Sequence, residues 1–165
     1  MTTALLEPPT RYYSSEVANL VWEAVSRHLS VDVRGRVRIG MTFQIPLPND
    51  RTRNSRPDIA IVLYDRWAKN RPLSLTGNAI DVVPNIAVEV ISPTDLAEAV
   101  TVKAMEYLDG GVQLVWQIFP EARVLFAHRP NGQPPGYASH CTRPRDILPG
   151  FRATLGELLP EVAAE

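Results

Sequence analysis

The sequence has little of several features that would assign it to a specialised class of protein. Cys141 is the only cysteine among 165 residues, which excludes an intramolecular disulfide and leads us to expect a reducing, cytoplasmic location. No apolar run approaches the about 20 residues that a membrane-spanning helix needs. The first residues also lack the basic and apolar regions of a secretory signal. We therefore expect no membrane partner.

An excess of charge of one sign, catalytic glycine motifs and internal repeats are missing as well. The net charge of −1 excludes a globally basic nucleic-acid-binding protein but allows a local basic patch. The three histidines lack zinc-ligand spacing, and no G-x-S-x-G elbow or phosphate-cradling glycine loop is present. With 45% hydrophobic residues, the chain is long enough to fill one core, so we predict a single domain spanning residues 1–165.

Hydrophobic periodicity predicts an α/β fold with a mixed sheet. A helix capped by Ser14 or Ser15 runs to about Leu29, and alternation predicts a strand over residues 31–39 with a bulge at Gly35. The other predicted elements are strands at 58–63, 86–91 and 112–118, a helix capped by Thr94 or Asp95 and ending at Gly110-Gly111, an antiparallel pair around Asn131-Gly132, and a closing helix after Thr154. The order helix, strand, strand, strand, helix, strand therefore defines the core.

Two carboxylates lie on the most apolar of these strands. Asp58 begins one apolar run, and Glu89 is a lone charge inside another. Burial of a charge is costly unless a metal ion, a raised pKa or a cation compensates for it, and Lys103 on the next helix supplies a cation. Because neighbouring strands lie about 4.8 Å apart, Asp58 and Glu89 could share one ion.

These residue types suit metal-dependent phosphodiester hydrolysis. Mg²⁺ or Mn²⁺ prefers carboxylate and carbonyl oxygens, which Asp58, Glu89 and the backbone of Val90 can offer. Lys103 would orient or deprotonate the attacking water and stabilise negative charge on the phosphate. The alternative is structural: Asp58 caps a turn beside Pro57, and Glu89 and Lys103 form a buried ion pair. Spacing alone leaves both interpretations open.

Arginines are concentrated in the stretch from residue 34 to residue 56, which carries an excess of five positive charges. Arg51, Arg53 and Arg56 form either a phosphate-binding patch or part of a solvated strand edge and loop.

Three further residues are candidates for supporting roles. Glu16 would reach the metal from the first helix or remain a solvated glutamate favoured by the helix dipole. Tyr107 would orient Lys103 or be a core aromatic with its hydroxyl at the surface. Ser92 would hydrogen-bond near the site or cap the following helix.

Four blocks of the chain resemble a known family. They are residues 56–62 (RPDIAIV), 84–93 (PNIAVEVISP), 103–112 (KAMEYLDGGV) and 114–116 (LVW). They are similar to the Uma family (Uma-two type) of restriction endonucleases, within the PD-(D/E)xK nuclease superfamily, and the similarity covers roughly residues 14–155.

The resemblance implies a restriction-endonuclease-like fold with Asp58, Glu89 and Lys103 as the acidic pair and the lysine. Ile91 stands where many superfamily members carry that lysine, so Lys103 replaces it. The expected function is DNA cleavage with Mg²⁺ or Mn²⁺, by a homodimer because two symmetric sites suit two strands. The alternative is a non-catalytic binding or assembly module that retains the fold.

Overall fold

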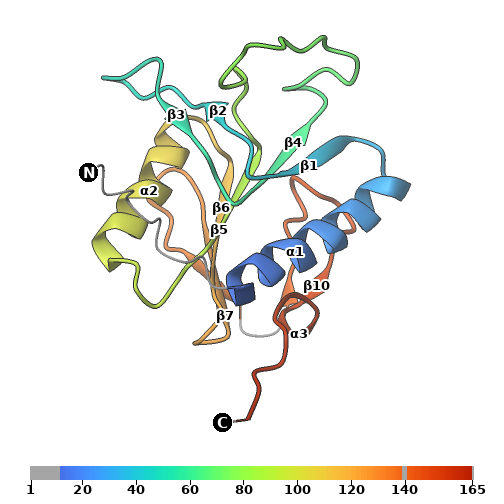
Figure 1. Ribbon diagram of the computed structural model, residues 1–165, viewed down its shortest axis with the longest axis vertical. Coiled ribbons are helices and arrows are strands. Elements are labelled where there is room, and N and C mark those ends of the chain that lie inside the picture. The colour runs from blue at the N-terminus through green and yellow to red at the C-terminus, as the bar shows by residue number, and fades with distance from the viewer. Residues whose placement is uncertain (1–11, 139–140, 165) are drawn as a thin grey trace, which may run out of the picture.

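The computed structural model describes residues 12–138 and 141–164. Its centre is a six-stranded sheet in the order β1-β4-β5-β6-β7-β8 (Figure 1). β5 and β6 are parallel, and the other neighbouring strands of this sheet are antiparallel. The strands are β1 (Gly35–Ile39), β4 (Ile59–Leu63), β5 (Ile86–Val90), β6 (Leu114–Phe119), β7 (Val124–His128) and β8 (Gly136–Ala138). The predicted α/β class with a mixed sheet is confirmed.

Helices pack on both faces of this sheet, and the strands run between α1 and α2 in Figure 1. Helix α1 (Tyr12–Val31) contributes five buried residues to the core on one face. Helix α2 (Ala97–Asp109) lies on the other face and connects β5 to β6. The remaining elements are short: β2 (Phe43–Gln44), β3 (Asn54–Ser55), β9 (Cys141–Thr142), β10 (Ala153–Thr154) and α3 (Leu155–Leu158).

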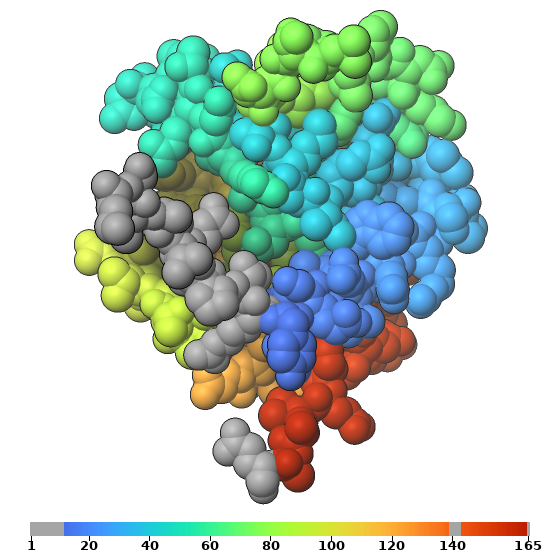
Figure 2. Space-filling model, in the orientation of Figure 1, coloured from blue at the N-terminus to red at the C-terminus, as the bar shows by residue number. Residues whose placement is uncertain are grey.

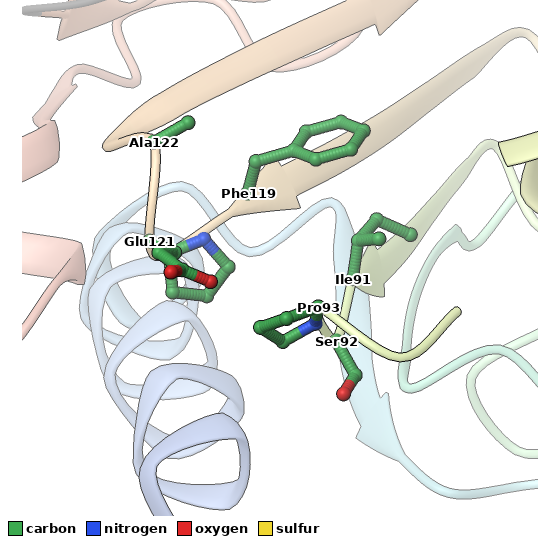
Figure 3. A pocket seen from close by; sticks show the side chains of 7 residues that line it. Ile91, Ser92, Pro93, Phe119, Glu121 and Ala122 are labelled. Atoms are coloured by element: carbon green, nitrogen blue, oxygen red, sulfur yellow. The ribbon is translucent and has the colours of Figure 1, made fainter. Parts of the chain in front are cut away.

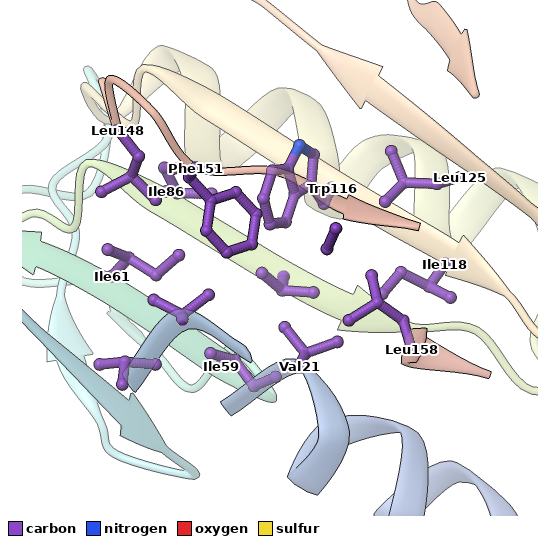
Figure 4. Packing of buried hydrophobic residues seen from close by; sticks show 14 of the residues in the cluster. Val21, Ile59, Ile61, Ile86, Trp116, Ile118, Leu125, Leu148, Phe151 and Leu158 are labelled. Carbon is purple, nitrogen blue, oxygen red and sulfur yellow. The ribbon is translucent and has the colours of Figure 1, made fainter. Parts of the chain in front are cut away.

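The alternation of side chains along the central strands gives the sheet two apolar faces. Ile59 and Ile61 of β4 enter the cluster under α1, where Val21, Trp116 and Leu158 also pack (Figure 4). The intervening Ala60 and Val62 of β4 enter the cluster beside α2. Burying a side chain the size of isoleucine stabilises the fold by about 1.5–3 kcal/mol, so the two clusters hold the sheet in place.

The C-terminal segment closes the face covered by α1. Thr154 and Glu157 form a reciprocal capping box at the start of α3, which confirms the short closing helix after Thr154. The Tyr13 hydroxyl of α1 donates a hydrogen bond to the Pro160 carbonyl at 2.6 Å. Figure 2 shows the red C-terminal segment against the blue α1. These contacts tie the two ends of the described chain to each other.

The first strand differs from its prediction. Helix α1 includes Ser14 and Ser15, so neither is its cap, and it continues to Val31, which is 88% exposed. Strand β1 begins only at Gly35 and pairs with β4 in unbroken register, so the predicted bulge is wrong. A Cβ at Gly35 would lie 2.7 Å from the Val62 carbonyl oxygen, and glycine is therefore needed for close approach.

The predicted N-caps of α2 are also wrong, whereas its predicted end at Gly110-Gly111 agrees with the C-cap Gly110. Its N-cap is Leu96, which makes no side-chain capping bond. Asp95 instead accepts a hydrogen bond from the Ser92 backbone at 2.8 Å, and the Thr94 backbone donates to the Ser92 hydroxyl at 3.4 Å. These side chains form hydrogen bonds within the turn after β5 and do not cap the helix. The first turn of α2 therefore has no side-chain cap.

Within the described residues, no helix has the length and apolar character needed to cross a bilayer.

Candidate active site

Asp58, Glu89 and Gln117 lie in a row across the sheet. The β4–β5 register pairs Ile59 with Val88, and one further step places Asp58 opposite Glu89. The β5–β6 register pairs Glu89 with Gln117. Because side chains alternate along a strand, all three belong to the face that carries the α2 cluster. The result is a polar row at the edge of an otherwise apolar face.

Glu89 is held by two side chains from α2. Glu89 is 8% exposed, and its Oε1 lies 2.9 Å from Lys103 Nζ. The Tyr107 hydroxyl donates to the same oxygen at 2.6 Å. Lys103 and Tyr107 are four residues apart on one helix face, so both reach the strand below. Tyr107 is 1% exposed, and the expectation that its hydroxyl lies at the surface is therefore wrong.

Burial dominates the proton equilibrium of Glu89. The pKa of Glu89 is raised to about 7, mainly by burial and in smaller part by the nearby Asp58 charge, while Lys103 and Tyr107 oppose the rise. Burial and the Glu89 carboxylate likewise raise the pKa of the Tyr107 hydroxyl, so that Tyr107 stays a hydrogen-bond donor. Near neutral pH, Glu89 therefore exchanges readily between its protonated and ionised forms.

Asp58 is fixed by a bond to the neighbouring strand. The Val90 backbone N–H donates to Asp58 Oδ2 at 2.8 Å, across 32 residues of sequence. The alternative in which Asp58 caps a turn beside Pro57 does not describe this side chain. Asp58 is partly exposed, whereas Glu89 is buried, so the two carboxylates differ in their access to water.

The two carboxylates each have one oxygen engaged by the protein. Within the described residues, the hydrogen bonds and ion pairs to them all fall on Glu89 Oε1 and Asp58 Oδ2. Glu89 Oε2 and Asp58 Oδ1 therefore remain as acceptors for water or a cation. The same residues contain no group of three or more His, Cys, Asp or Glu side chains that could hold a metal ion. The side chains at this site thus offer two hard oxygen ligands.

Two cavities flank this row of residues. One, of about 700 Å³, is lined by Asp58, Arg56 and Ser92 together with residues of α1. The other, of about 690 Å³, is lined by Lys103, Arg53 and Arg56. Because Arg56 lines both cavities, an arginine connects the Asp58 side of the site to the Lys103 side. A polyanion lying across both would meet positive charge beside the carboxylates.

Ile91 lies two residues beyond Glu89, where the resemblance places the lysine of other superfamily members. It is 8% exposed and lines a third cavity of about 280 Å³, together with Pro93, Phe119 and Ala122 (Figure 3). Because this position holds an isoleucine among mostly apolar neighbours, it supplies no amine. The Lys103–Glu89 contact brings the amine from the helix instead.

Of the remaining predicted site residues, some line the cavities beside the carboxylates and others do not. Ser92 lines the 700 Å³ cavity, but Glu16 is exposed and lies outside its lining, although Ser15 and Ala18 contribute to it. Glu16 therefore does not face the cavity beside Asp58. Arg51 is exposed and lines neither cavity.

The arginine-rich stretch does not form one continuous patch. Arg53 pairs with Glu106 of α2 at 3.1 Å, and Arg34 pairs with Asp32 at 2.8 Å. The Arg36 guanidinium lies over the Trp67 ring, 4.2 Å from its centroid. The excess of five charges in the sequence is therefore divided between local ion pairs, ring stacking and the exposed Arg51 and Arg56.

Sequence reasoning missed Gln117, which is 4% exposed and lies beside Glu89 in the row. Its Nε2 donates to the Val100 carbonyl of α2 at 2.8 Å, and its Oε1 lies 2.7 Å from His128 Nε2. The signal was available, because Gln117 is the lone polar residue in the apolar run of residues 114–119.

Comparison with known proteins identifies the family and supports the fold. Residues 3–156 match the Uma2 family model, described as "Putative restriction endonuclease". A crystal structure of a "putative nuclease belonging to DUF820" from Anabaena variabilis ATCC 29413 shares the fold, with a TM-score of 0.76 and 16% identity over 92% of this chain and 83% of that one. A comparison with curated proteins gives no match. Because the family match spans nearly the whole sequence, the chain belongs to the Uma2 family.

Proposed function

We propose that the protein is a metal-dependent endonuclease that hydrolyses DNA phosphodiester bonds in the cytoplasm. The observation that carries the proposal is the contact of Lys103 Nζ with the buried Glu89, opposite Asp58 and between two cavities joined by Arg56. The description of the family as restriction endonucleases supports the same reaction. Two carboxylates can hold a divalent ion, and an amine beside them can stabilise negative charge on the phosphate.

Asp58, Glu89 and the Val90 carbonyl would hold Mg²⁺ or Mn²⁺. The donor set fits these ions, because carboxylate and carbonyl oxygens are their preferred ligands and one oxygen of each carboxylate is not engaged by the described residues. A divalent ion would also relieve the repulsion from Asp58 that helps raise the pKa of Glu89. When bound, the ion would polarise the phosphoryl oxygen and lower the pKa of a bound water.

The chain's own residues would position the reactants. The Lys103 ammonium can donate hydrogen bonds to the attacking water and to the phosphate oxygens, on which negative charge develops. Tyr107 donates to the same Glu89 oxygen that Lys103 contacts and keeps the carboxylate from rotating. Arg51 and Arg56 are exposed and can bind phosphates along the DNA backbone. Arg53 would release Glu106 and bind a DNA phosphate in its place. A homodimer would present two such sites to the two strands.

Cleavage of supercoiled plasmid in Mn²⁺ or Mg²⁺ tests the proposal. We expect the parent to nick or cut, and Glu89→Gln and Lys103→Ala to lose cutting by about a hundredfold or more, the usual size of general acid–base and electrostatic contributions. Lys69→Ala is the matched control, because it removes the same charge from the chain's other lysine, outside the two cavities that flank the site. Circular dichroism must show that each variant is folded.

The alternative is a binding or assembly module with a structural Glu89–Lys103 pair. It predicts that the parent neither cuts DNA or RNA nor binds Mn²⁺ in a calorimetric titration. Folded variants that cut as fast as the parent would instead show that another set of residues performs the reaction.

A further inference from the structure

Helix α2, which carries Lys103, is weakly anchored by apolar contacts. Only Ala104 and Tyr107 of its 13 residues are buried. Its first turn is exposed, and its N-cap, Leu96, is 74% exposed and makes no side-chain capping bond. Because little apolar surface holds this helix, polar contacts to the sheet must contribute much of its placement.

Besides the Lys103–Glu89 pair itself, two polar contacts among the described residues tie α2 to the sheet, one on each side of Lys103. The Tyr107 hydroxyl bonds Glu89 of β5, four residues after Lys103. The Gln117 side chain of β6 bonds the Val100 carbonyl, three residues before Lys103. All of these α2 positions share one helix face. The Gln117 bond is thus the tie for the otherwise exposed first half of the helix.

Gln117 is itself held in one orientation. A carbonyl oxygen only accepts, so the Gln117 group facing Val100 must be the amide nitrogen, which leaves Oε1 facing His128. His128 Nε2 must therefore carry the hydrogen in that 2.7 Å contact. This bond persists whether the imidazole is neutral or protonated, because Nε2–H is a donor in both forms. Gln117 cannot rotate without breaking both bonds.

We propose that Gln117, locked by His128, is a positioning residue that holds the first half of α2 and so keeps Lys103 against Glu89. The link to catalysis rests on the proposed nuclease function, in which Lys103 serves the reaction. The tether itself does not depend on that function. The side-chain hydrogen bonds of Gln117 join it to Val100 and His128, and not to Asp58 or Glu89. Gln117 and His128 therefore act on the site only by holding α2 in position.

The tether can be tested without activity. The ¹⁵N spectrum of the His128 imidazole should show the neutral Nε2–H form above its pKa. Gln117→Met keeps the length of the side chain but removes both bonds, and amide hydrogen exchange should then quicken by about tenfold or more in residues 100–104 relative to β5. Ile118→Val is the control, since it weakens the opposite face of the same strand. An Nδ1–H tautomer, or uniform exchange across α2 and β5, would overturn the tether.

Kinetics then test the positioning role. A shift of Lys103 by about 1 Å should lower kcat by about tenfold to a hundredfold in Gln117→Met, with KM for DNA and Mn²⁺ affinity unchanged. His128→Phe should lower kcat as Gln117→Met does. His128→Gln can still donate to Gln117 Oε1 and should keep kcat close to that of the parent. Equal losses of metal affinity and kcat would mean that Gln117 only supports the sheet and would refute the proposal. If the parent protein does not cut DNA, the proposed nuclease function is wrong. The hydrogen-exchange result then still shows whether Gln117 holds the first half of α2.

Discussion

Replacing Glu89 by glutamine should stabilise the protein at alkaline pH, although it removes half of an ion pair. The folded-state pKa of Glu89 is raised from 4.5 to about 7, chiefly by burial. A raised carboxyl pKa means that the folded state binds the proton more tightly than the unfolded chain. The stability that this proton contributes is complete below pH 4.5 and is lost as the pH rises through about 7. Glutamine resembles the protonated side chain at every pH.

The magnitude follows from the shift. At about 1.4 kcal/mol for each tenfold change in proton affinity, ionising Glu89 in the folded protein costs about 3 kcal/mol above pH 7. The amide oxygen of the variant can still accept from Tyr107. Lys103 loses its counter-charge, but its side chain is 45% exposed and water can solvate it. The advantage of Glu89→Gln over the parent should therefore grow with pH.

Urea unfolding in EDTA, from about pH 4 to about pH 9, measures this difference. His128 titrates in the same window with the opposite sign, because burial lowers its pKa and its stabilising contribution is lost as the pH falls. Subtracting the parent's curve from the variant's removes this contribution, since both contain His128. A difference in unfolding free energy that stays constant from pH 4 to pH 9 would contradict the raised pKa of Glu89.

Three smaller perturbations test single contacts at the site and elsewhere in the fold. Tyr107→Phe removes the buried donor to the Glu89 carboxylate, so the unfolding free energy should fall by about 1–3 kcal/mol above pH 7 in urea titrations, and an unchanged midpoint would contradict the bond. Gly35→Ala places a Cβ 2.7 Å from the Val62 carbonyl oxygen and should cost about 1–3 kcal/mol, whereas a stabilised variant would show that β1 moves freely. Thr154→Ala breaks the capping box and should lower stability by about 1 kcal/mol by thermal unfolding, with no loss expected if α3 is held by its apolar contacts alone.

The pairing of Asp58 with Glu89 was accessible from the sequence because both are isolated charges on apolar strands. Lys103 was also visible as the available cation, but spacing alone could not choose between catalysis and a structural ion pair, and its assignment to catalysis came from the resemblance. The location of the arginines could not be predicted in this way. A sum of charges along the chain cannot show that Arg36 stacks on Trp67 or that Arg53 pairs with Glu106. Those contacts depend on tertiary packing.

The errors at element ends have a similar cause. Val31 and Val33 alternate as strand residues do, yet both are more than half exposed and Val31 ends a helix. Thr94 and Asp95 have good capping side chains, but the turn after β5 uses them first. In both cases a local preference was overridden by the neighbouring segment, which a single sequence does not reveal.

The parallel pairing of β5 with β6 has a consequence for the order in which the site forms. A parallel pair needs a crossover, and here the crossover is α2 itself. A chain emerging from the ribosome presents β4 and β5, with both carboxylates, before β6 is made. Until β6 arrives, the first half of α2 has no Gln117 to bind and little apolar surface of its own to bury. On the proposed tether, the first half of α2 is held only after the sheet is extended, so a nascent chain truncated before β6 should carry the acidic pair with a less ordered lysine.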